Sequence, residues 1–271
     1  MNIIKKTFYA IISYWNNFSW ACSAYFLKKK AIKRNIDSIF QGGTKIILIP
    51  HADDEWIGCS TIIRTYNDVL LCDMDMDGGD SKTVHAVRKK ELQSIADLNK
   101  KEIICIYEDK AKHLLEIIES QKPAYIFLPY YIDWHKEHIM VMDLLEEVLS
   151  QYTGDVYICM YQVSLPIADS QITHVLSMNK KSFLEKWDIF MQVYKSQKHL
   201  PIGRFGAHEK IAGALTNSFS AEVFCVKTKQ EWLNLKNQWL LTEEEKKECF
   251  TAINDIRKIR NTIINITDKK L

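Results

Sequence analysis

Five short apolar runs, separated by segments of helical length, constrain the fold of this chain more than any other feature. The runs cover residues 45–50, 69–72, 102–107, 125–129 and 156–161, and helices are predicted between them at 57–66, 82–99, 111–120 and 137–150. Runs that are apolar throughout are typical of strands buried on both faces. Their alternation with helices implies right-handed βαβ units. The sequence therefore predicts an α/β, Rossmann-like fold, with a mostly parallel sheet covered by helices on both faces.

The domain organisation follows from the absence of repeats, low-complexity tracts and Pro/Gly-rich linkers. We expect one α/β domain over residues 41–228, preceded by an aromatic and basic helical segment over 1–40 and followed by a helical extension over 229–271. In that extension, Thr242 and Glu245 have the spacing of a capping box, and helix is expected to about Ile264.

Charge and cysteine content narrow the class of protein. The formal net charge of +2 is too close to zero to argue for nucleic acid as a partner. The seven cysteines form no CxxC pair, and several lie inside apolar runs. Buried thiols in a reducing compartment explain this distribution better than disulfides do, so a cytoplasmic location is expected.

The N-terminal segment adds a second expectation about location. Lysines bracket an aromatic run that contains Phe8, Tyr9, Tyr14, Trp15, Phe18, Trp20, Tyr25 and Phe26. Interspersed serines and asparagines make this run too polar for a typical membrane span, and it lacks the pattern of a cleaved signal peptide. Two interpretations stay open. The helix lies in the membrane interface, at the inner face, or it packs on the protein's own core or on a second subunit. The oligomeric state is left undetermined.

Polar clusters follow the first and fourth predicted strands. PHADDE (residues 50–55) comes directly after the first, and DWHKEH (133–138) follows the fourth. In a parallel sheet, ligands bind at the carboxyl ends of the strands, so both clusters are expected at one edge. Two imidazoles and a carboxylate with an open fourth position form a common catalytic zinc set. Each cluster alone is more often a capped helix start than a metal site, and Asp53 or Asp54 could simply cap the helix that begins at Ile57. Because both clusters fall at strand exits, the residues by themselves leave both interpretations open.

Both clusters resemble motifs of the PIG-L/LmbE-like N-acetylglucosaminyl deacetylases. PHADDE is similar to that family's PHPDDE signature, and HKEH (residues 135–138) is similar to its HPDH motif. Four weaker similarities follow in the family's order. DGG at 77–79 is similar to its glycine loop, and Arg88, Glu91 and Ala96 have the spacing of its R-x-x-E helix. YKSQ at 194–197 is similar to its Y-x-SQ segment, and AEVF at 221–224 is similar to its final AEAF-like strand. The resemblance extends from about Ile46 to Val226.

The resemblance implies a metal centre and two catalytic groups. Its metal ligands would be His51, Asp54 and His138, holding zinc or, as the alternative, ferrous iron. Asp53 would be the general base, and a protonated His135 would polarise the amide carbonyl. Zinc lowers the pKa of bound water and polarises a carbonyl, which suits hydrolysis of an amide.

The resemblance also implies supporting residues. Arg88, Asp77 and Gly78 would contact the substrate, and Glu55 and Glu137 would orient the ligands from behind. By contrast, two interpretations stay open for Arg204 and His208: a loop near the pocket or, as the favoured one, a surface loop.

This sequence departs from the family pattern at three positions. Ala52 and Lys136 replace prolines, and Glu137 replaces an aspartate. None of these changes removes a ligand or the base, so we expect an active enzyme: a zinc-dependent N-deacetylase acting on a small-molecule or lipid-linked N-acetylglucosamine-type sugar in glycan or carbohydrate metabolism. Two alternatives are a deacylase of another aminosugar-bearing metabolite and a non-catalytic carbohydrate-binding protein.

Overall fold

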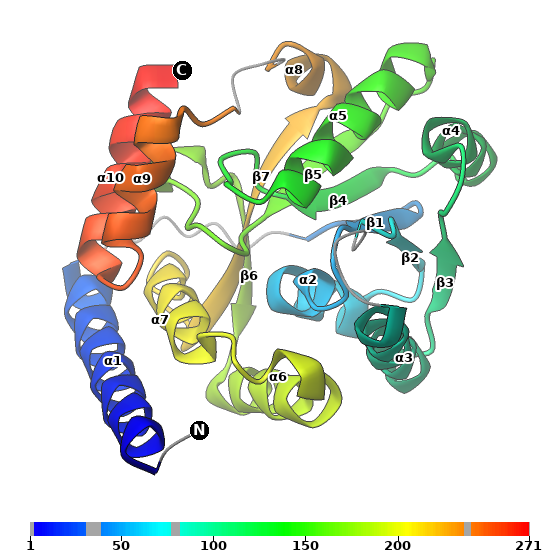
Figure 1. Cartoon of the computed structure of the whole chain (residues 1–271). Coiled ribbons are helices and arrows are strands. Elements are labelled where there is room, and N and C mark those ends of the chain that lie inside the picture. Colours follow the sequence, from blue (N-terminus) through cyan, green and yellow to red (C-terminus); the bar gives the residue numbers. More distant parts are fainter. Residues whose placement is uncertain (1–2, 31–38, 77–81, 236–239, 271) are drawn as a thin grey trace.

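The computed structural model describes residues 3–30, 39–76, 82–235 and 240–270 (Figure 1). The predicted substrate residues Asp77 and Gly78 lie outside the described residues. The elements up to the fifth strand are α1 (Ile3–Lys30), β1 (Lys45–Ile49), α2 (Asp54–Thr65), β2 (Val69–Asp73), α3 (Lys82–Asn99), β3 (Glu102–Cys105), α4 (Lys110–Gln121), β4 (Tyr125–Pro129), α5 (Lys136–Gln151) and β5 (Tyr157–Tyr161). The remaining strands and α-helices are β6 (His174–Met178), α6 (Lys180–Val193), α7 (Ile202–Ala212), β7 (Ser220–Thr228), α8 (Lys229–Leu233), α9 (Glu243–Ala252) and α10 (Ile256–Lys270).

The described strands form one sheet in the order β3-β2-β1-β4-β5-β7-β6. Strands β1 to β5 pair in parallel, whereas β7 runs antiparallel to both β5 and β6. The predicted α/β fold with a mostly parallel sheet is therefore confirmed. The antiparallel edge comes from β6 and β7, of which only β7 was expected.

The strand order changes direction between β1 and β4. These strands are neighbours, with Ile46 opposite Ile126, although β2 and β3 lie between them in the sequence. From this point the chain proceeds through β2 and β3 on one side and through β5 on the other. The loops that leave β1 and β4 therefore diverge and open a crevice at the carboxyl edge of the sheet, where α/β proteins bind their ligands.

Helices cover both faces of the sheet, as predicted (Figure 1). Alternate residues of each strand point to opposite faces, so Ile46 and Leu48 enter one core while Ile47 and Ile49 enter the other. The first core is completed by side chains of α4, α5, α8, α9 and α10. The second is completed mainly by α2, α3 and α6. Burial on both faces explains why the strands read as continuous apolar runs.

The start of α2 and the division of the C-terminal helix are the main differences from the predicted helices. Helix α2 begins at Asp54, three residues before the expected start at Ile57. The predicted C-terminal helix is divided, because the carboxylate of Asp255 accepts hydrogen bonds from the backbone N–H of Arg257 and Lys258 and starts α10 anew. The capping box of Thr242 and Glu245 is confirmed at the start of α9.

The N-terminal helix packs one side against the body of the protein. Trp20 and Ala24 of α1 are buried among residues of α7 and α10. A Cβ added at Gly203 of α7 would lie 1.9 Å from the side-chain oxygen of Asn17, so a glycine permits this close helix contact. Among the described residues, no helix combines the length and apolar character that crossing a membrane requires. The division of the chain at residues 40 and 228 stays a prediction.

Candidate functional site

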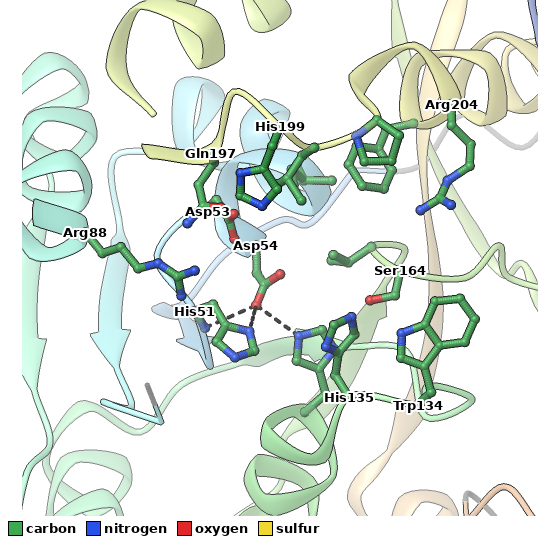
Figure 2. A pocket seen from close by; sticks show the side chains of 16 residues that line it. His51, Asp53, Asp54, Arg88, Trp134, His135, Ser164, Gln197, His199 and Arg204 are labelled. Carbon is green, nitrogen blue, oxygen red and sulfur yellow. Dashed lines mark hydrogen bonds and ion pairs between the residues drawn. The ribbon is translucent and has the colours of Figure 1, made fainter. Parts of the chain in front are cut away.

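The three residues expected to bind metal come together at the crevice. His51 and Asp54 follow β1, and His138 lies in the first turn of α5, after β4. The Asp54 Oδ2 atom is 3.3 Å from His51 Nδ1 and 3.1 Å from His138 Nε2. Atoms about 3.3 Å apart have the spacing of tetrahedral ligands around an ion ~2.0–2.1 Å from each of them. One potential ligand atom from each residue lies within 4.8 Å of the others, so this triad fits a metal ion (Figure 2).

Asp133 holds His138 in position from the far side of the ring. Its Oδ2 atom is 2.9 Å from His138 Nδ1, and its Oδ1 accepts a hydrogen bond of 2.9 Å from the backbone N–H of His135. A carboxylate behind a ligating imidazole fixes the tautomer and orients the other ring nitrogen. The sequence prediction gave this role to Glu137 and missed Asp133, although its place in the loop between β4 and α5 was a usable signal.

The charges of the triad region are mutually dependent. Burial lowers the pKa of His138, but the carboxylates of Asp133 and Asp54 overcome this effect and raise it well above its usual value. Burial raises the pKa of Asp54, but the imidazoles of His138 and His51 lower it further than burial raises it. Asp54 is therefore an ionised carboxylate at neutral pH, the form in which a carboxylate binds a cation.

Asp53 occupies the bend between β1 and α2. Its φ of 147° lies in a region that side chains other than glycine rarely adopt, and such strain is concentrated at functional sites. The side chain makes no cap hydrogen bond to α2, so the helix-capping interpretation is not supported for Asp53. Instead the carboxyl group lines the pocket beside the triad. Burial, together with the neighbouring carboxylates of Asp54 and Glu55, raises the pKa of Asp53 well above its usual value.

Glu55 stabilises the bend at Asp53 between β1 and α2. It is fully buried, and its Oε2 accepts a hydrogen bond of 3.0 Å from the backbone N–H of Asp53. The hydroxyl of Tyr194 donates to the other carboxylate oxygen of Glu55. Tyr194, which follows α6, thereby links the YKSQ segment to the strained bend.

His135 and Glu137 lie on the α5 side of the triad. The ring centroid of His135 is 5.0 Å from that of His138, and the side chain lines the pocket. Burial lowers the pKa of His135, which favours the neutral imidazole rather than the protonated form expected from the sequence. Glu137 Oε2 is 3.8 Å from His51 Nε2 and its side chain is one-third exposed, so the contact is peripheral.

Arg88 of α3 enters the pocket opposite α5. The side-chain oxygen of Gln197 accepts hydrogen bonds from Arg88 Nε and Nη2 at 2.8 and 2.9 Å when the Gln197 amide is oriented to satisfy both groups. One turn along α3, the Glu91 carboxylate accepts a hydrogen bond of 2.9 Å from the backbone N–H of Ser196. The R-x-x-E and YKSQ segments, distant in sequence, are therefore joined at the pocket wall.

Arg204 and His208 correct the sequence prediction. Both lie in helix α7 and are buried, whereas a surface loop was expected. Arg204 lines the pocket, but His208 does not. The pocket has a volume of about 260 Å³, close to the lower end of the ~300–1,000 Å³ of typical ligand sites, and therefore suits a small ligand or one end of a larger one.

Behind the pocket, a second group of buried charges ties α2, α6, α7 and β7 together. The ammonium group of Lys186 donates hydrogen bonds to the backbone oxygen of Ile57 and to the carboxylates of Glu209 and Glu222. Burial lowers the pKa of Lys186, and the two carboxylates raise it to above its usual value. Lys186 therefore remains charged in the core.

The fold is shared with solved structures of low sequence identity. N,N'-diacetylchitobiose deacetylase from Pyrococcus horikoshii matches with a TM-score of 0.57 and 19% identity, over 71% of this chain and 87% of that one. The conserved protein TT1542 from Thermus thermophilus matches with a TM-score of 0.55 and 16% identity, over 68% and 94% of the respective chains. A deacetylase of the teicoplanin biosynthetic pathway matches with a TM-score of 0.52 and 16% identity, over 68% and 98%.

No family model matches this sequence. At these identities the structural likeness shows the fold alone. The chain thus has an α/β fold seen in deacetylases, and it presents a His-Asp-His cluster suited to a metal ion at the switch point of its sheet.

Proposed function

We propose that this protein is a metal-dependent hydrolase that removes the acetyl group from the nitrogen of an N-acetylglucosamine-type sugar conjugate. One observation carries the proposal: a buried carboxylate, Asp53, is held at a strained bend next to a triad of metal-binding character without serving as a helix cap. The structural likeness to a diacetylchitobiose deacetylase and a teicoplanin-pathway deacetylase supports the same class of reaction.

A metal held by His51, Asp54 and His138 would supply Lewis acidity and a water molecule of lowered pKa. Zinc is the proposed metal, because a set of two imidazoles and one carboxylate with a remaining open position is common for it.

Asp53 is the proposed general base. Its raised pKa makes its ionised form a stronger base than an exposed carboxylate, which favours removal of a proton from the attacking water. The oxygen of that water bonds to the carbonyl carbon of the acetamide, and the carbon–nitrogen bond then breaks. The proton taken by Asp53 passes to the leaving nitrogen, so acetate and a free amine are the products.

His135 is proposed to act on the carbonyl oxygen. As a neutral imidazole it can donate its ring N–H to the negative charge that develops on that oxygen. Asp133 fixes the backbone of His135, and the His135 ring lies beside that of His138, which places the donor near the triad before the reaction begins.

The sugar is proposed to lie between Arg88 and Trp134, which line opposite sides of the pocket (Figure 2). Arg88, which Gln197 holds in place, is proposed to contact the sugar hydroxyls. The indole of Trp134 offers an apolar face on which a pyranose ring can stack.

The test is to measure bound metal and acetate release together, with wild-type protein and the variant Asp53→Asn, on a panel of N-acetylglucosamine conjugates. Stoichiometric metal, with acetate release by the wild type that is lost in the variant, supports the proposal. Metal without acetate release from any conjugate would redirect the assignment to another acyl group. Failure to bind metal after zinc is supplied would instead favour a non-catalytic carbohydrate-binding protein.

A further inference from the structure

Arg204 is a buried cation inside the pocket for which the described residues provide no anionic partner. Its side chain descends from α7, and only 8% of the residue is exposed. Within the described parts of the chain, no carboxylate and no hydrogen-bond acceptor contacts its guanidinium group. The guanidinium carbon lies 5.3 Å from the centroid of the Phe205 ring. Burial without a compensating carboxylate lowers the pKa of Arg204 to about 10.

An arrangement of this kind is unfavourable for the protein alone. A buried charge normally has a partner that replaces the water it has lost, and an uncompensated one destabilises the folded state. Arginine also remains protonated at neutral pH even after this shift, so the charge persists. A buried and unpaired guanidinium in a pocket is therefore better explained by a ligand than by the fold.

The position of Arg204 in the pocket defines what it would meet. Figure 2 shows Arg88 and Arg204 entering from opposite sides, with His51 and Asp54 of the triad between them. Ser164 and Trp134 lie on the Arg204 side. A sugar whose acetamide reaches the triad would therefore extend its attached group toward Arg204. The hydroxyl of Ser164, which lines the same part of the pocket, offers a further hydrogen-bond donor there.

We propose that the substrate carries an oxyanion, a phosphate or a carboxylate, on the group attached to the sugar, and that Arg204 binds it. The planar guanidinium matches both anions through paired N–H donors. This inference rests on the proposed deacetylase function, because it places the sugar by its acetamide. It extends that function by naming the chemical class of the conjugate.

The experiment compares three conjugates that differ only in the attached group: N-acetylglucosamine 1-phosphate, the carboxymethyl glycoside and the neutral methyl glycoside. We expect kcat/KM for one or both anionic conjugates to exceed that for the methyl glycoside by at least about tenfold, as a buried charge-assisted interaction provides. In Arg204→Met this preference should fall to about one. The phosphate and carboxylate arms show which anion the site takes.

Two controls separate the role of Arg204 from an effect on folding. Lys210→Met removes one positive charge from the same helix outside the pocket and should keep the preference. Arg204→Met should melt at the same temperature as the wild type or higher, since it removes an uncompensated buried charge. A lower melting temperature, with the preference retained, would show that Arg204 serves the fold and would overturn the inference.

A binding measurement separates this inference from the proposed function. Calorimetry with Asp53→Asn and the double variant Asp53→Asn/Arg204→Met uses N-acetylglucosamine 1-phosphate, the carboxymethyl glycoside and the methyl glycoside as ligands, without turnover. Tighter binding of an anionic ligand that depends on Arg204 supports the oxyanion site, even if the wild type releases no acetate. Acetate release by the wild type without any preference for anionic conjugates overturns the oxyanion site and leaves the deacetylase function standing.

A second inference concerns the outer face of α1 and stands on different observations. One side of α1 packs on the protein through positions 20 and 24. The opposite side of the helix carries positions 14, 15, 18, 22, 25 and 26. Trp15 is 67% exposed and Tyr14 75%, whereas Trp20 on the packed side is 5% exposed. The outward side chains of this aromatic face are Tyr14, Trp15, Phe18, Tyr25 and Phe26.

The charges around the aromatic face distinguish its partner. Helix α1 contains no Asp or Glu, and it carries lysines at positions 5, 6, 28, 29 and 30. A second copy of the helix would bring lysines together without a counter-charge on either helix. Lys28 does not face outward, because its Nζ donates hydrogen bonds to the backbone oxygens of Ser218 and Phe219. An anionic lipid surface complements the exposed Lys29 and Lys30. Exposed tryptophan and tyrosine side chains are typical of the boundary between headgroups and acyl chains.

We propose that the aromatic face of α1 docks on an anionic membrane surface. The opposite side of α1 packs on α7, which also carries Arg204, so docking would hold the pocket one helix away from the lipid. This location would suit a conjugate whose oxyanion is attached to a lipid.

The test is cosedimentation of the full chain with vesicles of phosphatidylcholine, alone or mixed with phosphatidylglycerol. We expect binding to the mixed vesicles that weakens with salt, and a loss of about tenfold or more in Trp15→Gln/Phe18→Gln/Phe26→Gln. The matched control Leu98→Gln/Leu184→Gln/Leu240→Gln, exposed outside α1, should bind as the wild type does. Equal binding by all three proteins, or a dimer that the α1 variant alone dissociates, would overturn the proposal.

Discussion

Two groups of buried charges lie a short distance apart in this molecule, and they differ in how far their charges are compensated. Around Lys186, each charge has its partners: Glu209 and Glu222 accept from the ammonium group, and Glu222 also accepts a hydrogen bond of 3.0 Å from the backbone N–H of Thr61. In the pocket, Asp53 is buried beside two other carboxylates, and within the described chain Arg204 has no carboxylate beside it.

The difference separates structural from functional charges. A buried ion network that satisfies its own members connects elements of the fold and leaves nothing for a ligand. Charges that remain uncompensated reduce stability, and they persist in a pocket where a substrate or a metal provides what is missing. Removing a charge should therefore lower the stability of the folded protein around Lys186, but not in the pocket.

The largest effect is expected at Asp53. Asp53→Asn should lower the rate of acetate release by about 10²–10⁴-fold, because the amide cannot take a proton from water. Its melting temperature should not fall, since a strained site loses a buried charge that its neighbours disfavour. Steady-state kinetics and a thermal melt on the same preparation check both parts. A variant of full activity would remove Asp53 from the mechanism.

At Lys186, in contrast to Asp53, we expect a large loss of stability. Lys186→Met should lower the free energy of unfolding by about 3–5 kcal/mol, because it leaves two carboxylates buried without a cation. Urea denaturation measures this change. The exposed pair of Arg64 and Glu185, 2.7 Å apart, provides the control, and Arg64→Met should cost no more than about 1 kcal/mol. Equal losses in the two variants would show that the buried Lys186 network stabilises the fold no more than an exposed ion pair does.

Asp133 belongs to the functional region but acts through His138. Asp133→Asn should weaken metal binding by about 10–100-fold, because His138 loses the carboxylate that orients its ring. Competition with a chelator of known affinity measures the effect. An unchanged affinity, with the protein folded, would mean that the ring is held by packing alone.

The smallest effect is expected at Glu137, where the sequence departs from the PIG-L/LmbE-like pattern. Glu137→Asp should change kcat/KM by less than about threefold, since ion pairs between partly exposed groups contribute little. The 3.8 Å contact with His51 and the one-third exposure of the carboxylate place it at the edge of the site. A change of tenfold or more would show that Glu137 orients His51 during the reaction.

The location of the site was predictable from local sequence. The strands before both polar clusters are apolar runs, which is typical of strands buried on both faces of a sheet. In a parallel sheet the residues after such strands lie at one edge, so the meeting of His51 and His138 was predictable from the order of apolar runs and polar clusters. The role of Asp133 was within reach, because Asp133 lies in the short loop between β4 and α5. The sequence pattern does not indicate the direction in which each side chain points. That direction decides whether Asp133 or Glu137 is the partner of His138.

Helix α7 shows why other parts were not predictable. Gly203 and Gly206 weaken its intrinsic helix propensity, so the segment reads as a loop. A Cβ at Gly206 would lie 3.0 Å from the Phe183 ring, and one at Gly203 would meet Asn17 of α1. The glycines therefore serve close packing against elements distant in sequence, and this packing stabilises the helix that buries Arg204.

The sequence by itself determined the parallel α/β sheet and the two strand exits that hold the candidate metal ligands, because both depend on local periodicity and on the order of the elements. Only the tertiary structure decided which buried charges are compensated. Compensation depends on distances between residues such as Lys186 and Glu222, or on the lack of a carboxylate beside Arg204 in the described chain. Those distances arise when α1, α6, α7 and β7 pack together, and no short-range pattern encodes them.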